Sequence, residues 1–472
     1  MTRTRHPVVL IHGVFGYGKR RPLWNTWSPY WPEAALQDMD ANHLIVDVGV
    51  LSSDHDRACE AFYQLYGGRV DYGEEHSTQS GHSRYGATFE TALHPNWSAE
   101  NPVHLLGHSF GATTAIELYQ LLCQDAFGVG SDHRWVKSIV CIAGPLSGTT
   151  LTHLFGLHDG KMVAHTLGHL IGASLCFWHR LHTHFPVLSN IFEYRMPQWE
   201  FVTSYREILS ASSRILTSPD LALYDILPAR RLERNSRLIE MNKPFLVSIA
   251  TSTRSTIPLV ECLLGAKLVA IVAAAVAHAW QGDTIELKTL SLFGIGALVI
   301  FSMLRHRIRR LDYASISVLT FLRVQMSLCV RYLHEIFDGF DHQEWEPNDG
   351  AVNVKSMLQP LQAPCPLYES DISSSSGSGD ETSSSASTVG SFSTVRPLLS
   401  IEPLDLDAFG KPDDCEYPAE NAIAVETEKL PLQRGRWYVH QVEKNHLAGT
   451  HFDADAPALY GKLLRLIATE FE

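Results

Sequence analysis

Short runs of apolar, often β-branched residues recur along the chain and alternate with stretches of helical periodicity. The apolar runs cover residues 7–11, 44–48, 103–106, 136–142 and 245–249. Helical patterns lie between some of these runs, for example over residues 56–66 and 113–123. Strands that alternate with helices in this way indicate a mostly parallel sheet with helices on both faces. The pattern therefore predicts an α/β fold.

Two strongly apolar segments, 258–280 and 289–304, depart from this alternation. They are joined by a polar piece and followed by a basic cluster at 305–310. A membrane-spanning helix needs about 20 apolar residues, and the first segment is long enough, although it carries Glu261 and Lys267. Three interpretations remain open: a membrane-embedded helical hairpin, a buried helix pair, or a self-association surface.

A serine-rich stretch at 373–393 is the second exception, and an acidic, proline-containing run follows it to about residue 429. Such a composition cannot bury enough apolar surface to offset the entropy lost on ordering. We therefore expect a low-complexity, largely disordered insertion over residues 358–435.

The composition narrows the classes of binding partner expected for this protein and the cellular compartment expected for it. The chain has 472 residues, of which 45% are hydrophobic, and its formal net charge of −13 argues against a nucleic-acid partner. The eight cysteines are scattered without a C-x-x-C pair, which is typical of reduced core thiols in an intracellular protein. The N-terminus runs directly into a predicted strand and lacks the apolar stretch of a signal peptide. We therefore expect an intracellular location.

The sequence Gly107-His108-Ser109-Phe110-Gly111 follows a predicted strand and precedes a helical pattern. A strand, a sharp turn and a helix form the context of a nucleophile elbow, in which small residues flank an exposed serine. An ordinary strand-to-helix turn with a capping serine is the alternative. The context favours Ser109 as a nucleophile.

A serine nucleophile needs a histidine as its base and an acid that orients the histidine, in the chain order serine, acid, histidine. Asp349 is the acid candidate, although the sequence Asn-Asp-Gly around it is also typical of a plain β-turn. His446 is the preferred base because it lies on a loop before the predicted C-terminal helix, 457–471. His440 and His451 are the alternatives.

An oxyanion hole needs two backbone N–H groups that point at the developing negative charge. One is expected from Phe110, directly after the nucleophile. The other is expected from Val14, in the glycine-rich loop that follows the first predicted strand.

Six blocks of the sequence carry a more specific signal when they are read together. They are VVLIHGVFGYG, LSSDHDRACEAFYQLYGGRVDYGEEHSTQSGHSRYG, VHLLGHSFGATTAIEL, GPLSGTTL, LTSPDLALYDI and PNDGAVNVKSM. Together they resemble the zinc-containing thermoalkalophilic bacterial lipases. The resemblance extends in blocks over about residues 7–250 and 338–357, and more weakly over 436–470. It implies an α/β-hydrolase with eukaryote-like insertions.

The resemblance also implies roles for particular residues. It assigns the catalytic triad to Ser109, Asp349 and His446. It implies a structural zinc ion outside the triad, held by two imidazoles and two carboxylates, which suit tetrahedral Zn²⁺. The matching residues are Asp56, His76, His82 and Asp220.

One part of the resembling pattern is missing here. The family binds calcium near the catalytic histidine through a glutamate two residues after it, and this chain has Ala448 at that position. Asp453 matches a second ligand, but Ala454 replaces the proline that follows it. These departures make calcium doubtful.

The predicted organisation is a hydrolase core interrupted by insertions. Aromatic-rich residues 151–206 are expected to form a helical lid over the site, or a permanently packed cap. The predicted parts are 1–257 (core with zinc loop and lid), 258–310 (apolar helical hairpin insertion), 311–357 (core with the catalytic acid), 358–435 (disordered insertion) and 436–472 (core with the catalytic histidine and a C-terminal helix).

These features predict a lipase that cleaves long-chain acyl glycerolipids through an acyl-enzyme. Lipid is the expected substrate, and a lipid–water interface or membrane is the expected partner. The apolar insertion favours a membrane or lipid-droplet surface as the location. An acyltransferase or phospholipase on the same scaffold and a non-catalytic membrane scaffold are the alternatives.

Overall fold

The computed structural model describes residues 3–39, 41–158, 160–196, 198, 218–253, 313–363, 395–410 and 431–472. The two apolar segments and the serine-rich stretch lie outside these residues, so the interpretations of both remain predictions. Within the described part of the chain, no helix has both the length and the apolar character needed to cross a membrane.

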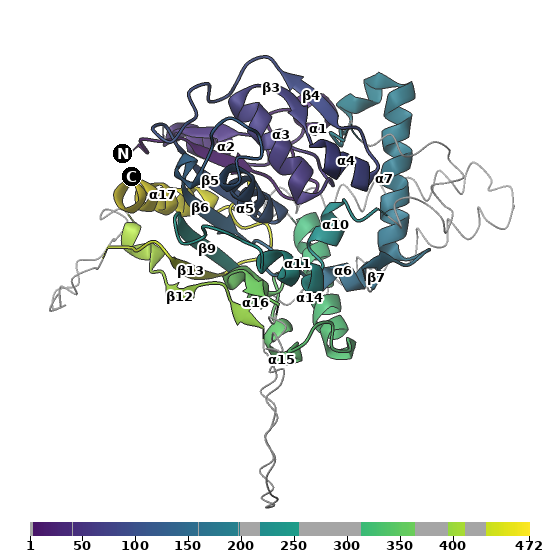
Figure 1. The fold of residues 1–472 in the computed structure, drawn as a ribbon. Coiled ribbons are helices and arrows are strands. Elements are labelled where there is room, and N and C mark those ends of the chain that lie inside the picture. Colours follow the sequence, from purple (N-terminus) through teal and green to yellow (C-terminus); the bar gives the residue numbers. More distant parts are fainter. Residues whose placement is uncertain are drawn as a thin grey trace, which may run out of the picture.

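A parallel sheet of seven strands, in the order β12-β13-β9-β6-β5-β1-β2, forms the centre of the molecule (Figure 1). Its strands are β1 (Val8–Ile11), β2 (His43–Ile45), β5 (Val103–His108), β6 (Val136–Ile142), β9 (Phe245–Ser252), β12 (Ser400–Pro403) and β13 (Arg436–Glu443). Every residue of β1 and β5 is buried, as expected of parallel strands that are covered on both faces.

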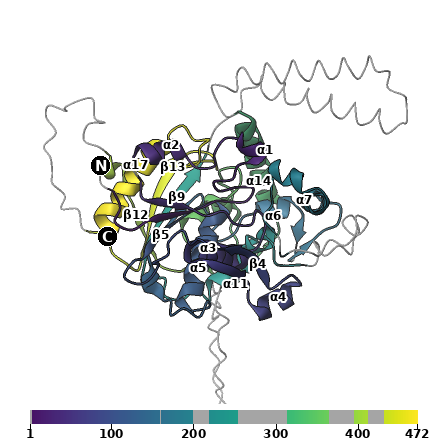
Figure 2. The same cartoon turned by 90° about the horizontal axis from the view of Figure 1, so that it is seen from above.

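Helices cover both faces of this sheet. Figure 2 shows α2 (Glu33–Asp38) and α17 (Ala456–Leu466) on one side, and α3 (Asp54–Tyr66) and α5 (Phe110–Cys123) on the other. The apolar core lies between the sheet and these helices, and it includes the fully buried Trp31, Phe62 and Trp437. The α/β arrangement predicted from the alternating pattern is confirmed.

The long helix α3 shows how the sequence sets local boundaries. The Ser53 hydroxyl accepts a hydrogen bond from the Asp56 amide and so caps the first turn. The helix ends at Gly67, which has a φ of 93°. Glycine adopts this angle readily, whereas residues with a Cβ rarely do. The cap at Ser53 thus holds the first turn of α3, which carries Asp56.

Smaller elements complete the fold outside the central sheet and its main helices. A hairpin and a short helix follow α3, namely β3 (Gly68–Asp71), α4 (Glu74–Ser80) and β4 (Tyr85–Phe89). The predicted lid region contains α6 (Leu151–Leu154), β7 (Leu157–His158), β8 (Lys161–Met162), α7 (Leu167–His184) and the 3₁₀ helix η2 (Pro186–Asn190). The remaining elements are α1 (Pro22–Asn25), η1 (His133–Trp135), α10 (Ala222–Asp225), α11 (Pro228–Asn235), α14 (Tyr313–Tyr332), α15 (His342–Trp345), α16 (Val354–Leu358), β10 (Leu361–Gln362), β11 (Arg396–Pro397), η3 (Leu406–Phe409) and the π-helical η5 (Ile467–Phe471).

Residues 395–410 correct the prediction of a disordered insertion over 358–435. They include β12, which pairs in parallel with β13 at the edge of the central sheet. They also include Leu406 and Phe409, which are buried in the core and close to α17. The composition of this stretch gave no strand signal, but sheet pairing and two buried apolar side chains order it.

Candidate active site

Ser109 lies at the sharp turn between β5 and α5, where the backbone is strained. Its φ of 55° and ψ of −128° are unusual for a residue with a side chain. A Cβ on Gly107 would lie 2.2 Å from the carbonyl oxygen of Gly111, and a Cβ on Gly111 would lie 2.0 Å from that of Ile11. Both glycines are therefore required sterically, as a nucleophile elbow demands.

The structure brings Ser109, Asp349 and His446 together from three distant parts of the chain. His446 Nε2 lies 2.7 Å from Ser109 Oγ, and His446 Nδ1 lies 2.8 Å from Asp349 Oδ2. Asp349 lies in the turn before α16, and His446 lies in the loop between β13 and α17. In this geometry the serine hydroxyl donates to Nε2 while Nδ1–H donates to the carboxylate, which is the arrangement of a hydrolytic triad.

The two alternative histidines lie elsewhere. His440 is within β13, and its Nδ1–H donates to the carbonyl oxygen of Leu404. The side chain of His451 is exposed next to Phe452. Of the three candidates, only His446 has a hydrogen bond to Ser109 within the described part of the chain.

Asp349 is fully buried and surrounded by hydrogen-bond donors. Besides His446, its carboxylate accepts from the Thr251 hydroxyl at 2.6 Å and from the amides of Ala351 and Val352 at 3.0 and 2.8 Å. These donors fix the carboxylate against the imidazole. Thr251, at the end of β9, had no signal in the sequence that marked it for this position.

The backbone N–H groups of Val14 and Phe110 are free to bind an oxyanion. Among the described residues, neither amide donates a hydrogen bond, and both residues line the same cavity as Ser109 and His446. The guanidinium of buried Arg57 lies 4.8 Å from the centre of the Phe110 ring and donates to the carbonyl oxygen of His12. A buried cation therefore supports both sides of the predicted oxyanion hole.

A buried hydrogen-bonded chain links the oxyanion loop to the histidine loop. The Gly13 amide donates to the Tyr30 hydroxyl at 3.0 Å, and this hydroxyl lies 2.6 Å from His108 Nδ1. His108 Nε2 lies 2.8 Å from the carbonyl oxygen of His446. Because a carbonyl only accepts, Nε2 carries the proton and Tyr30 donates to Nδ1. Burial lowers the pKa of His108 to about 3, so the ring is neutral.

Sequence reasoning placed His108 inside the serine motif but did not assign it this role. The other members of the chain are 78 residues away, at Tyr30, and 338 residues away, at His446. Nothing in the local sequence indicates such contacts.

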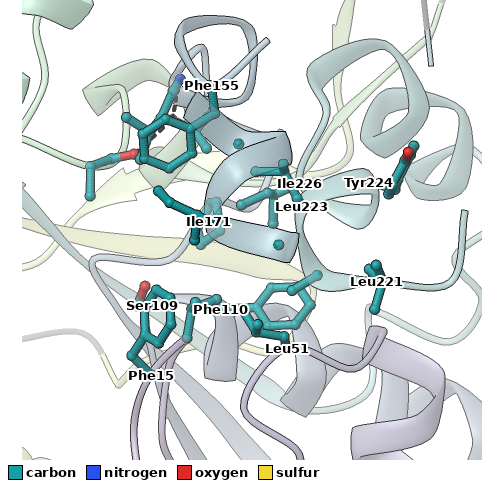
Figure 3. A pocket seen from close by; sticks show the side chains of 18 of the residues that line it. Phe15, Leu51, Ser109, Phe110, Phe155, Ile171, Leu221, Leu223, Tyr224 and Ile226 are labelled. Atoms are coloured by element: carbon teal, nitrogen blue, oxygen red, sulfur yellow. Dashed lines mark hydrogen bonds between the residues drawn. The ribbon is translucent and has the colours of Figure 1, made fainter. Parts of the chain in front are cut away.

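Ser109 opens into an apolar cavity of about 430 Å³. Figure 3 shows Ser109, Phe15 and Phe110 on one side and Phe155 and Ile171, from the predicted lid region, on the other. Within the described residues, no Lys, Arg, Asp or Glu lines the cavity. Its other walls are mainly apolar, and they include Leu51, Leu151, Met162, Met196, Leu221, Leu223, Ile226, Val318, Leu322 and Val352.

The four residues predicted to hold a metal form a compact cluster. One ligand atom from each of Asp56, His76, His82 and Asp220 lies within 4.8 Å of all the others. His76 Nε2 lies 3.2 Å from Asp56 Oδ1 and 3.3 Å from Asp220 Oδ1, and His82 Nε2 lies 3.1 Å from Asp220 Oδ2. Two imidazoles and two carboxylates at these distances can hold a metal ion, so the predicted ligand set is brought together.

The electrostatics of this cluster also favour a cation. Burial lowers the pKa of His76 and His82, but the carboxylates of Asp220 and Asp56 outweigh it and raise the pKa to about 9 and about 10. The same contacts hold the pKa of Asp220 below its usual range, although burial opposes them. Positive charge between the two carboxylates, from protons or from a metal ion, is therefore stabilising.

The sheet order, the strained serine turn and the hydrogen-bonded triad define an α/β-hydrolase. Residues 4–227 match the family described as lipase-like, C-terminal domain. The chain is 30% identical over 250 residues to Lipase 2 of Staphylococcus aureus (strain MRSA252), covering 47% of this chain and 34% of that protein. It is 29% identical over 272 residues to the lipase of Staphylococcus hyicus, covering 51% of this chain and 39% of that protein.

Two solved structures share the fold across nearly the whole chain. The crystal structure of Staphylococcus hyicus lipase superposes with a TM-score of 0.58 at 20% identity, covering 98% of this chain and 96% of that one. Lipase 1 from Pelosinus fermentans gives a TM-score of 0.57 at 20% identity, covering 99% of both chains. The predicted resemblance to bacterial-type lipases and the α/β-hydrolase fold are confirmed. The chain spans only about a third of the length of the staphylococcal relatives.

Proposed function

We propose that this protein is a lipase that hydrolyses carboxylic esters of long acyl chains, with glycerolipids as the substrate class. The observation that carries the proposal is the hydrogen-bonded set Ser109–His446–Asp349 at the edge of an uncharged, apolar cavity. An apolar wall suits an acyl chain, and the absence of charged side chains from the described wall suits a neutral substrate. The names of the staphylococcal relatives support the same class of reaction.

The geometry supports a two-step acyl transfer to water. Ser109 Oγ attacks the ester carbonyl while His446 Nε2 takes the hydroxyl proton, and Asp349 stabilises the resulting imidazolium. The amides of Val14 and Phe110 stabilise the tetrahedral oxyanion. His446 then returns the proton to the leaving alcohol, and water that it activates releases the fatty acid from Ser109.

We further propose that the metal cluster holds a structural Zn²⁺ ion. Two nitrogen and two oxygen ligands complete a tetrahedral shell and leave no open position for chemistry. The ligands come from α3, α4, the turn after α4 and the segment before α10. Such an ion would clip these four segments together beside the cavity.

We also propose that the enzyme works at a lipid–water interface. Several large apolar side chains near the cavity are exposed, including Phe15 at 48%, Leu167 at 53% and Phe177 at 47%. Phe15 itself lines the cavity, and Leu167 and Phe177 lie on α7, which contributes Ile171 to the same wall. A lipid surface would cover these side chains while substrate enters.

The decisive experiment compares the wild-type protein with Ser109→Ala and His446→Ala on triacylglycerols, phospholipids and p-nitrophenyl esters. We expect kcat to fall at least about a thousandfold in both variants, because each removes a member of a unit that acts together. Ser109→Ala should also lose labelling by a fluorophosphonate probe. His451→Ala is the matched control and should keep wild-type rates. Retained hydrolysis in folded Ser109→Ala would refute the proposal, and product formation only with an added acyl acceptor would favour a transferase.

A further inference from the structure

The loop that carries His446 is closed at its base by an ion pair. Lys444 Nζ lies 2.5 Å from Asp453 Oδ1 and 2.9 Å from Asp455 Oδ2. The side chains of Lys444 and Asp453 are 24% and 10% exposed, so this pair is largely shielded from water. Lys444 precedes His446 and Asp453 follows it, and the ion pair therefore joins the two ends of the loop.

Asp453 also organises the backbone inside the loop. Its Oδ2 accepts a hydrogen bond from the Gly449 amide at 3.0 Å, and its Oδ1 accepts one from the Asp455 amide at 3.1 Å. Gly449 has a φ of 77°, and a Cβ there would lie 3.1 Å from Ile142 Cδ1, so the turn packs tightly against β6. The position of His446 thus depends on a carboxylate whose charge is balanced by Lys444.

The residues of this loop do not fit the calcium ion that the lipase resemblance implies. Calcium takes six to eight oxygen ligands, but Ala448 offers no side-chain oxygen and is itself buried. The carboxylate of Asp453 is already engaged by two amides and the Lys444 ammonium, all of which are donors. An ammonium group at this carboxylate would also repel a divalent cation.

We propose that Lys444 is a built-in cation that clamps the His446 loop to Asp453 and makes the site independent of calcium. Lys444 acts as a positioning residue, because it is not among the described residues that line the cavity. This inference rests on the proposed function only in so far as ester hydrolysis is one of its readouts.

The first test needs no variant. Wild-type protein is dialysed against EGTA, and hydrolysis of a p-nitrophenyl ester is measured with and without added Ca²⁺. We expect the rate to change by less than about twofold, since no catalytic positioning depends on the ion. Loss of activity in EGTA that Ca²⁺ restores and Zn²⁺ does not would overturn the proposal.

The second test removes the clamp. We expect Lys444→Met to lower kcat about tenfold, equivalent to about 1.4 kcal/mol in the barrier, with KM within about twofold of the wild type. Lys444→Arg should recover most of the rate because it restores the charge. Lys462→Met is the matched control: Lys462 lies on α17 and pairs with Asp407 at 2.6 Å, so it loses the same charge without touching the loop. Equal kcat in Lys444→Met and Lys462→Met would contradict the clamp.

A structural readout separates the failure of this inference from failure of the proposed function. Amide hydrogen exchange at Gly449 should accelerate at least about tenfold in Lys444→Met and stay at the wild-type rate in Lys462→Met. If the wild-type protein hydrolyses no ester, the proposed function fails while exchange still tests the clamp. If exchange at Gly449 is unchanged in Lys444→Met, the clamp is wrong whatever the activity. If Lys444→Met does not fold, the rate of Lys444→Arg and the calcium experiment test the clamp instead.

Discussion

At the scale of single residues, the site depends on positions where a side chain has no room. Gly111 is the tighter of the two glycines of the serine turn, because its missing Cβ lets α5 approach the end of β1 at Ile11. Phe110, the residue before Gly111, lines the same cavity as Val14. The glycine therefore contributes both to packing and to the geometry of the proposed oxyanion hole.

We expect Gly111→Ala to lower the free energy of unfolding by about 3 kcal/mol or more, since the new methyl group would overlap backbone atoms that cannot rotate away. Urea unfolding followed by circular dichroism measures the change. Gly461→Ala, in α17, is the control, because the nearest atom to its Cβ is Met39 Sδ at 3.8 Å. That variant should be stabilised by about 0.5–1 kcal/mol through helix propensity. Equal stability of the two variants would contradict the steric account.

At the scale of elements, the metal cluster joins pieces that have little core of their own. The segment around α4 and β4 is short and largely exposed, and α10 spans four residues. His76 and His82 each contact both Asp56, at the start of α3, and Asp220, just before α10, and these contacts link the pieces. Without an ion, protonated imidazoles supply the positive charge between the carboxylates.

Removal of the metal by a chelator should lower the thermal midpoint, because an ion that binds only the folded state at a thousandfold excess over Kd stabilises it by about 4 kcal/mol. The loss should grow with pH. In the metal-free protein the pKa values of His76 and His82 are raised to about 9 and about 10, so their ionic contribution is complete below the unfolded value near 6.5 and disappears as pH rises through 9–10.

Calorimetry with metal analysis on the same sample checks this prediction, and His82→Ala should bind no ion. His94→Ala is the control, because His94 lies on another surface turn, where its ring hydrogen-bonds the carbonyl oxygen of Asn101. A metal-free preparation whose midpoint does not respond to Zn²⁺ would rule out the ion.

At the scale of the whole molecule, the chain buries several histidines in the neutral form. Burial lowers the pKa of His6, His12, His104 and His108, and for His108 the value is about 3. They lie along β1 and β5 or directly beside them. Protonation of these rings therefore destabilises the centre of the sheet. An unfolded chain binds these protons near pH 6.5.

The stability that these four neutral histidines contribute should therefore be complete above pH 6.5 and fall as the pH drops below it. Each histidine that stays neutral in the folded state contributes a loss of about 1.4 kcal/mol per pH unit below its unfolded pKa. Urea midpoints at successive pH values between 7 and 5 give the slope. His108→Gln should flatten it, while exposed His451→Gln should leave it unchanged. A flat wild-type profile would show that these rings are charged in the fold.

Much of the fold was predictable because local pattern and burial agree. The apolar runs marked β1, β5, β6 and β9, and the motif around Ser109 implied a strand, a turn and a helix in that order. The short edge strand β12 was missed, because residues 400–403 are ordered by pairing with β13 rather than by an apolar pattern of their own.

The sequence alone determined the nucleophile turn and the fold class, since steric rules for small residues and hydrophobic periodicity act over a few neighbouring positions. Only the tertiary structure decided between His446 and its two alternatives, and only it placed Tyr30, Thr251 and Lys444 around the site. Those contacts join residues that are far apart along the chain or on opposite ends of a loop, and no short-range rule encodes such distances. They exist because burial of the shared core brings the ends of separate strands to one edge of the sheet.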